Sequence, residues 1–361
     1  VGLYDLVDGH LVRRSSSEFD VDGERTEVPQ LVGERQPDLV LLNDGDLSYT
    51  KIRLDERSQQ TVVHHIADFE DPLAAAISFG AAWDMTRDAE MAASDWVTLV
   101  LNGLGPNTGA TAARTLTLQT RRVVATYTDP EHRSTEAARW ESGLHRLVLA
   151  ADPGSDQQLT YLQALADVAH SDDTLGLIHG LLDGSQPVTG LVVDADLRWT
   201  LLSGLARAGR VSVDTVAAEL ARDNTINGRQ RAAAARAAMP TAEAKANAWR
   251  DMVERDELPN ETVRSIAMAF NQPNQADVLT PYVAKYLTAA DTLWEDKGAH
   301  EGQLLLRMLF PWAEASARTR AAVQQWLDHT TAEPAPRRFM REGLANLDRA
   351  LRAQATDAQA H

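Results

Sequence analysis

The hydrophobic pattern of the chain changes once, near residue 57, and this change limits the folds that the chain can adopt. Before it, short apolar stretches alternate with turn residues; after it, the helix formers Ala, Leu, Arg, Glu and Gln dominate. The segment at the change holds an apolar strand at 39–42 and an Asn-Asp-Gly-Asp turn at 43–46. The next residues with one alternating face are Tyr49, Lys51, Arg53 and Asp55. We therefore predict a mainly α chain, with a β region at 1–57 and a helical region at 58–361.

The β region reads as about four short strands. Asp8-Gly9 and Asp22-Gly23 are dipeptides that suit tight turns with positive φ. A sheet of about four short strands needs a second layer to bury its apolar face. We therefore interpret these strands as part of a β-sandwich. We expect few core contacts to cross from this region into the helices.

Local signals mark several helix ends in the region after residue 57. Asp71-Pro72 and Asp129-Pro130 have the acidic cap and following proline typical of a helix start. Ser212, Thr241 and Asn260 are candidate N-caps.

The expected helix starts near 212, 227, 241 and 260 are only about 14 to 19 residues apart. Such spacing favours antiparallel helix pairs stacked side by side, and Gly184 and Gly209 suit left-handed C-terminal positions. We predict an α-α superhelix of HEAT or armadillo type, whose concave side would hold a partner or substrate.

Charge and composition exclude several classes of partner. The chain has 35 Lys and Arg against 52 Asp and Glu, a net charge of −17, which repels nucleic acid. No cysteine occurs, so disulfides and thiolate metal sites are excluded, and a cytoplasmic location is compatible with this composition. Every apolar run is far shorter than the roughly 18 residues of a membrane span, so we expect no membrane contact.

The sequence contains no complete catalytic motif. His300-Glu301 begins the His-Glu-x-x-His pattern of a zinc peptidase, but the second histidine is missing and Gly302 weakens the helix. We therefore predict neither a catalytic residue nor a metal site within this chain.

Two clusters remain that could contact a ligand. In the segment 270–275, the amides Gln272, Asn274 and Gln275 surround a proline that ends a helix, and amides both donate to and accept from peptide backbone. Arg341 belongs to an arginine cluster near the C-terminus and could meet a peptide carboxylate. The alternatives are capping of adjacent helix ends for the amides, and a solvated or ion-paired face for the arginines.

Four segments, 41–55, 217–223, 237–245 and 270–276, resemble the corresponding parts of aminopeptidase N, a zinc aminopeptidase family. The order of residue types is most similar to the actinobacterial type, and the last region resembles the C-terminal domain of the endoplasmic-reticulum aminopeptidases. The resemblance implies an enzyme that removes N-terminal amino acids from peptides with one zinc ion held by two His and a Glu. None of those ligands is in this chain, which opens on Val1 in strand-like alternation, so we expect a preceding catalytic half.

On this resemblance, the chain would cover the active-site chamber and shape substrate access, and would be inactive alone. Its partners would be the catalytic and N-terminal domains of the same protein and peptide substrates. Gln272, Asn274, Gln275 and Arg341 would line the chamber. The alternative is an independent helical-repeat scaffold that binds a protein or peptide. A chamber wall should carry amides and arginines on its concave face, whereas a scaffold should expose an apolar patch there.

Overall fold

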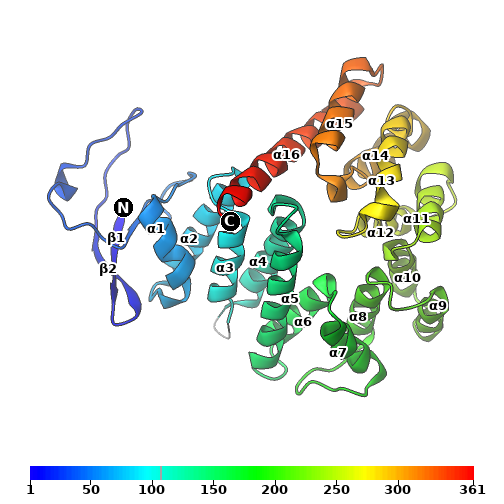
Figure 1. Ribbon diagram of the computed structural model, residues 1–361, viewed down its shortest axis with the longest axis horizontal. Helices are drawn as coiled ribbons and strands as arrows, with labels where there is room; N and C mark the ends of the chain where they lie inside the picture. The colour runs from blue at the N-terminus through cyan, green and yellow to red at the C-terminus, as the bar shows by residue number, and fades with distance from the viewer. Residues whose placement is uncertain (106–107) are drawn as a thin grey trace.

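The computed structural model describes residues 1–105 and 108–361. A small antiparallel sheet lies at the N-terminus, and helices that follow one another at short intervals make up the rest (Figure 1). The predicted mainly α fold with a small β region before the helices is therefore confirmed.

The sheet consists of antiparallel strands in the order β2-β1-β3. The strands are β1 (Gly2–Val7), β2 (His10–Ser16) and β3 (Leu39–Leu41). The turn between β1 and β2 has positive φ at both Asp8 and Gly9, 50° and 84°, as the dipeptide predicts. Gly23 also has a positive φ, of 67°, but lies in an irregular loop. The described residues therefore form three strands where we expected about four.

The segment after β3 turns as predicted. The side-chain oxygen of Asn43 accepts a hydrogen bond from Ser48 N at 2.9 Å, and its amide donates to Ser48 O at 2.8 Å. Beyond the turn, Lys51 and Arg53 lie on one side, because both contact the carboxylate of Asp88, at 3.3 and 2.7 Å. The predicted alternation is right for Lys51 and Arg53, although the segment forms no strand in the described structure and Asp55 caps α1 instead.

The helical region begins with α1 (Glu56–His65) and ends with α16 (Pro334–Gln359). Between them lie α2 (Pro72–Arg87), α3 (Ala93–Gly103), α4 (Ala110–Arg122), α5 (Arg133–Ala150), α6 (Asp156–Val168), α7 (Asp172–Asp183), α8 (Ala195–Arg207), α9 (Val213–Arg222), α10 (Ile226–Ala238), α11 (Ala242–Trp249), α12 (Asn260–Phe270), α13 (Ala276–Ala289), α14 (Leu293–Met308) and α15 (Ala317–His329). Shorter helical turns are η1 (Pro29–Leu31), η2 (Ile66–Asp68), η3 (Val123–Tyr127), η4 (Arg250–Glu254) and η5 (Trp312–Glu314).

Most of the predicted helix ends are confirmed. Asp71, Ser212 and Thr241 each cap the helix that follows, because each side chain accepts a hydrogen bond from a backbone N–H in its first turn. Gly184 and Gly209 are left-handed, with φ of 82° and 70°, at the ends of α7 and α8.

Two helix starts differ from the prediction. Asn260 is the first residue of α12, and Pro259 occupies the cap position without a capping side chain. α5 begins at Arg133 and not at Asp129-Pro130, because the Asp129 carboxylate contacts His132 Nδ1 at 2.9 Å instead of capping a first turn.

The helices form two curved layers. α4, α6, α8, α10 and α12 pack each against the next, and α5, α7, α9 and α11 pack against this row. Figure 1 shows α6, α8, α10 and α12 nearer the middle of the arc than α7, α9 and α11, so these four helices line its concave side. The stacked helix pairs predicted from spacing are therefore present.

The last helix returns across the open side of the arc, and Figure 1 places the C-terminus beside α3. The fully buried carboxylate of Asp357 accepts hydrogen bonds from Ser94 N, at the start of α3, and from Asp129 N, each at 2.9 Å. An acidic group is stabilised at a helix N-terminus, so Asp357 fixes the end of α16 to the first helices.

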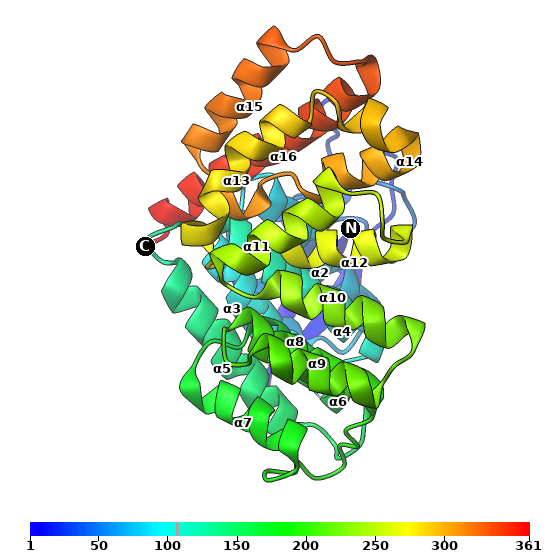
Figure 2. The ribbon, with the colours of Figure 1, turned by 90° about the vertical axis from the view of Figure 1, so that its right-hand side faces the viewer.

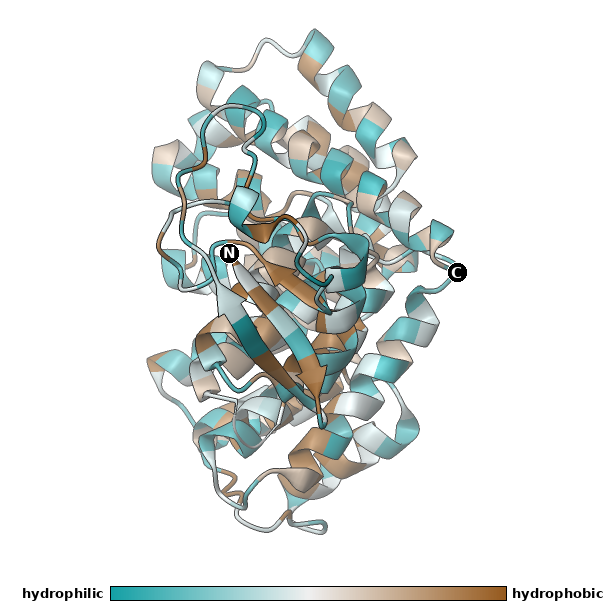
Figure 3. Cartoon of the chain, turned by 90° about the vertical axis from the view of Figure 1, so that its left-hand side faces the viewer, coloured by the Kyte–Doolittle hydropathy of each residue, from teal (hydrophilic) through white to brown (hydrophobic). Residues whose placement is uncertain are grey.

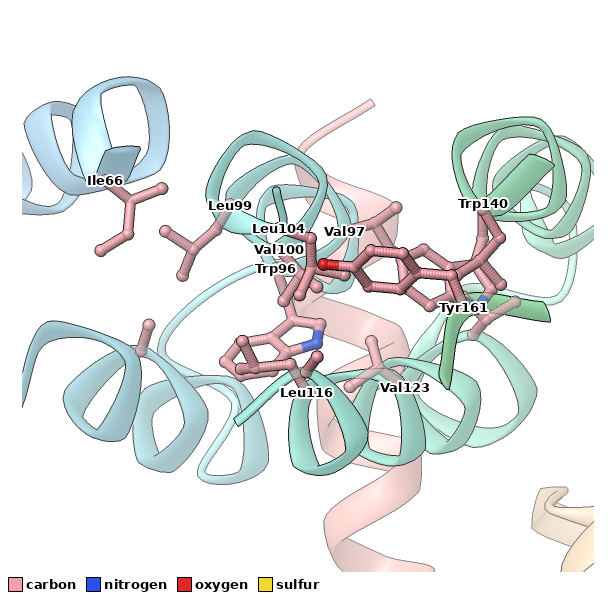
Figure 4. Packing of buried hydrophobic residues seen from close by; sticks show 14 of the residues in the cluster. Ile66, Trp96, Val97, Leu99, Val100, Leu104, Leu116, Val123, Trp140 and Tyr161 are labelled. Carbon is pink, nitrogen blue, oxygen red and sulfur yellow. The ribbon is translucent and has the colours of Figure 1, made fainter. Parts of the chain in front are cut away.

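Large aromatic side chains fill the core between the first helices. Trp96, Trp140 and Tyr161 are almost completely buried, and Figure 4 shows them among aliphatic side chains from α3, α4 and neighbouring elements. Trp96 Nε1 donates to Thr120 Oγ1 at 3.0 Å, so its polar atom is satisfied within the core.

The core continues from the sheet into the helices. Leu39, Leu41, Ile52 and Leu54 belong to the same buried cluster as Val62 of α1. Figure 3, viewed from the side of the sheet, shows the strands lying directly over the helices. Our expectation of few core contacts across this boundary was wrong, because β3 and the segment after it bury their apolar side chains against α1 and α2.

Candidate functional site

The C-terminal ends of five stacked helices meet on the concave side. One hollow there is lined by residues from the last turns of α4, α6 and α8, from along α10, and from the end of α12. The last carbonyls of a helix have no partner within the helix, so this edge gathers many acceptors in one place. It also gathers the partial negative charge of five helix ends.

Two side chains bridge these ends between neighbouring helices on the α6 to α10 side. Arg207, at the end of α8, donates from Nη2 to Ala166 O and Ala169 O at the end of α6, at 3.0 and 3.1 Å. Gln275 donates from Nε2 to Arg207 O at 3.0 Å and to Ala238 O at 2.9 Å, which joins α8 to α10.

Two further side chains continue the row. Lys245 Nζ donates to Ala237 O and Phe270 O, each at 2.8 Å, which joins α10 to α12. Asn271 donates to Met308 O and Phe310 O at the end of α14, each at 3.0 Å. We call Arg207, Gln275, Lys245 and Asn271 the bridging side chains.

Lys245 is unusual because it is completely buried without a carboxylate partner among the described residues. Its ammonium lies 5.4 Å from the centre of the Phe270 ring. The carbonyl ends of two helices favour the charged form. Burial opposes the charge and lowers the pKa of Lys245 to about 7.

A hollow of about 500 Å³ opens beside the bridging side chains. Arg121 of α4 stands at its wall, with Nη1 3.4 Å from the carboxylate of Asp167 and Nη2 3.5 Å from Gln272 Oε1. Burial lowers the pKa of Arg207 to about 10, so its guanidinium stays charged at neutral pH. Arg231 also lines the hollow and contacts Asp196 at 2.5 Å. The lining therefore holds three arginines and one carboxylate, that of Asp167.

The structure separates the four predicted site residues. Gln272 lines this hollow, and its amide donates to Ala269 O at 3.0 Å. Asn274 is exposed, has a left-handed φ of 62°, and lines a small adjoining hollow of about 40 Å³. Gln275 is buried, and its amide is used in bridging α8 and α10. Arg341 lies exposed on α16 and lines neither hollow.

This arrangement offers hydrogen bonds and positive charge. Arginine and amide groups can bind carbonyl and carboxylate oxygens, and Gln272 can both donate and accept. Such groups suit binding and positioning of a peptide better than proton transfer at neutral pH, because a guanidinium keeps its proton.

The sequence prediction missed the four charged residues of the hollow: Arg121, Asp167, Arg207 and Arg231. Arg121 and Arg207 occupy last turns of helices, where basic residues are common for capping alone, so their position gave no distinct signal. Arg121 meets Gln272 across 151 residues of chain.

The incomplete zinc pattern does not assemble into a metal centre. Glu301 of α14 lies 3.7 Å from Lys297 Nζ, which occupies it as an ion-pair partner. Across residues 1–105 and 108–361, the structure brings together no group of three or more His, Asp or Glu side chains able to hold a metal ion. In the same residues, no helix combines the length and the apolar character of a membrane span.

Two comparisons place the chain among known proteins. The model of the ERAP1-like C-terminal domain family matches residues 39–349. The chain is 41% identical, over all 361 of its residues, to a Streptomyces lividans protein named aminopeptidase N. It spans 42% of the length of that relative.

Proposed function

This chain belongs to the ERAP1-like C-terminal domain family, and on that premise we propose that it is the supporting helical part of a zinc aminopeptidase. Catalysis would be the task of another part of the same protein, which removes N-terminal amino acids from peptides. The observation that carries this proposal is the match to aminopeptidase N, which runs along the whole chain but along only 42% of the relative.

In this proposal the concave side forms one wall of the chamber in which peptides are bound. Arg121 and Gln272 would face the peptide and bind its carbonyl or carboxylate oxygens. Asn274 would contact the peptide from the adjoining hollow. The bridging side chains would hold the helix ends that position these groups, a supporting role that we assign to Gln275 in place of direct contact.

The remaining parts of the proposal concern the whole protein. Residues 1–57 would connect the helices to the catalytic half, and 58–361 would form the helical wall. Zinc would be held by the catalytic half, whose metal activates water for attack on the peptide bond. The partners of this chain would be the catalytic and N-terminal domains and the peptide substrates.

The alternative of an independent scaffold predicted an apolar patch on the concave face. The hollow there is lined by arginines, amides, serines and Asp167, with Met268 and three alanines among them, and this polar majority favours the chamber wall.

The proposal can be tested by introducing Gln272→Ala and Arg121→Ala into the complete enzyme. We expect kcat/KM for a ten-residue peptide to fall by about tenfold, since one lost charge-assisted hydrogen bond costs about 1.4 kcal/mol or more. Hydrolysis of a leucyl anilide should stay within about twofold, because that substrate is too short to reach the hollow.

Arg318→Ala, on the exposed surface of α15, is the matched control and should change neither rate. Melting temperatures of all variants show whether the fold is kept. An equal fall in kcat/KM for both substrates would mean that the hollow does not bind the peptide.

A further inference from the structure

A second and larger hollow lies on another side of α10, away from the candidate site. Its volume is about 1000 Å³, and it is bounded by α9, α10, α11, η4 and the start of α12. Figure 2 views this side and shows α9, α10 and α11 one above another, facing the viewer. We call it the outer groove; it shares Gln230 with the concave hollow but otherwise has a different lining.

The groove exists because small side chains stand where neighbouring helices would otherwise interdigitate. Ala233 of α10 and Ala244 of α11 line it, and neither reaches across the space between α9 and α11. Packed interiors leave few voids of this size, so an unfilled space between helices is a binding candidate.

The lining of the groove includes apolar side chains that remain open to solvent. Val213 and Ile226 are 54% and 68% exposed. Leu220 and Leu258 are half-buried beside them. Burying such groups under a partner would be favourable, by about 25 cal/mol for each Å² of apolar surface removed from water.

Arginines without an ion-pair partner surround this apolar surface. Arg229 contacts the side-chain oxygen of Asn224 at 2.9 Å, and Arg250 contacts that of Asn247. Arg236 and Arg250 each keep a buried Nε–H without a hydrogen-bond acceptor in the part of the chain that the structure describes. Within the same part, Arg229, Arg236 and Arg250 each lack a carboxylate within ion-pair distance.

The charge of the groove is opposite to that of the chain. Arg229, Arg236, Arg250 and Arg255 line it against two acids, Glu243 and Asp251. The chain as a whole carries −17. A local excess of positive charge around an apolar floor is complementary to a segment that has apolar anchors flanked by carboxylates.

We propose that the outer groove is a docking site for an acidic amphipathic segment of a partner protein. Apolar side chains of the segment would enter between α9 and α11, and its carboxylates would meet Arg229, Arg236 and Arg250. Apart from Gln230, the groove and the concave hollow have no lining residue in common, so the site would act whether or not the chain belongs to a peptidase chamber.

The test uses fluorescence anisotropy with fluorescein-labelled peptides of fourteen residues. Each peptide carries Leu and Glu, with the Leu residues spaced either for a helical face or for an extended strand. Two matched sets replace every Glu by Gln or every Leu by Ser. We expect a member of the acidic and apolar set to bind, and both replacement sets to bind at least tenfold more weakly. Raising the salt from 50 to 500 mM should weaken binding by a similar factor.

Variants of the chain locate the binding site. Arg236→Glu with Arg250→Glu should weaken binding at least tenfold, and so should Arg229→Glu, whose exposed position leaves the fold unaffected. Arg318→Glu removes an exposed arginine of α15 and should leave affinity unchanged.

Several outcomes would overturn the proposal. These are no binding by any peptide, equal binding of the Glu and Gln peptides, and binding that survives the substitutions in the groove. Binding of anionic vesicles in preference to the peptides, or self-association lost in Arg229→Glu, would assign the groove to a lipid surface or to a second copy of the chain.

Discussion

The two ends of the stacked helices are satisfied in different ways. At the N-terminal ends of α6, α8 and α10, the residue immediately before each helix caps it: Ser155, Asp194 and Thr225 accept from backbone N–H groups three residues ahead, at 3.1, 2.8 and 3.0 Å. At the C-terminal ends, the carbonyls are bridged by side chains from other helices or from loops far along the chain. Gln275, for example, reaches carbonyls 68 and 37 residues away.

The two kinds of contact stabilise the superhelix differently. A local cap stabilises one helix, whereas a bridging side chain fixes two helices relative to each other. Substitutions at the C-terminal edge should therefore lower the free energy of unfolding more, and disturb more helices, than substitutions at the N-terminal edge. The concave hollow lies at the C-terminal edge.

Removing residues 1–57 should lower stability the most, because it removes all contacts between the β region and the helices. Leu39, Leu41, Ile52 and Leu54 share a buried cluster with α1, so their removal exposes apolar surface on the helices. We expect the melting temperature, measured by calorimetry, to fall by more than about ten degrees. A fall of under about three degrees would mean that 58–361 is an independent domain.

Gln275→Ala should lower the free energy of unfolding by about 3 kcal/mol, because it leaves one buried and one partly buried carbonyl unpaired. Hydrogen exchange should accelerate in the last turns of both α8 and α10. Gln325→Ala, at an exposed position of α15, is the control and should stay within about 0.5 kcal/mol. Faster exchange in one helix alone would show that the two ends are not coupled.

Lys245 makes this edge sensitive to pH. Its pKa is about 7 in the folded chain and about 10.4 when unfolded, so between these values the unfolded chain binds the extra proton. Native stability relative to Lys245→Met should therefore rise with pH, by up to about 1.4 kcal/mol per unit between pH 7 and 10. Urea unfolding at pH 7.5 and 9 measures this difference. A difference independent of pH would mean that Lys245 stays charged in the folded state.

Ser155→Ala tests the other edge and should have the smallest effect, about 1 kcal/mol. Hydrogen exchange should change only in the first turn of α6, because the cap contacts no other helix end. A loss as large as that of Gln275→Ala would abolish the distinction between the two edges.

The sequence predicts the local caps of the helices better than the side chains that bridge different helices. Ser212 and Thr241 were identifiable as caps because the signal and its effect lie within one turn of chain. The amide cluster at 270–275 was identifiable as well, and capping of helix ends, one of its two interpretations, describes Gln275. Lys245 and Arg207 carry no local signal of burial, because a basic side chain within a helix is ordinarily expected on its solvated face.

The candidate site was predictable only in part for the same reason. Gln272 was predicted because it belongs to the amide cluster at 270–275. Its neighbour Arg121 belongs to a helix and lies 151 residues earlier in the chain. Only the stacking of α4 through α12 brings the two together, and periodicity in one sequence does not give the register of that stack.

We propose that this chain supports catalysis by another part of the same enzyme. The most direct test measures hydrolysis of a leucyl anilide with added zinc by this chain, by a separately produced catalytic half, and by their mixture. We expect no activity from the chain alone and a higher rate from the mixture than from the catalytic half by itself. Activity of the chain alone, or a mixture no faster than the catalytic half, would contradict it.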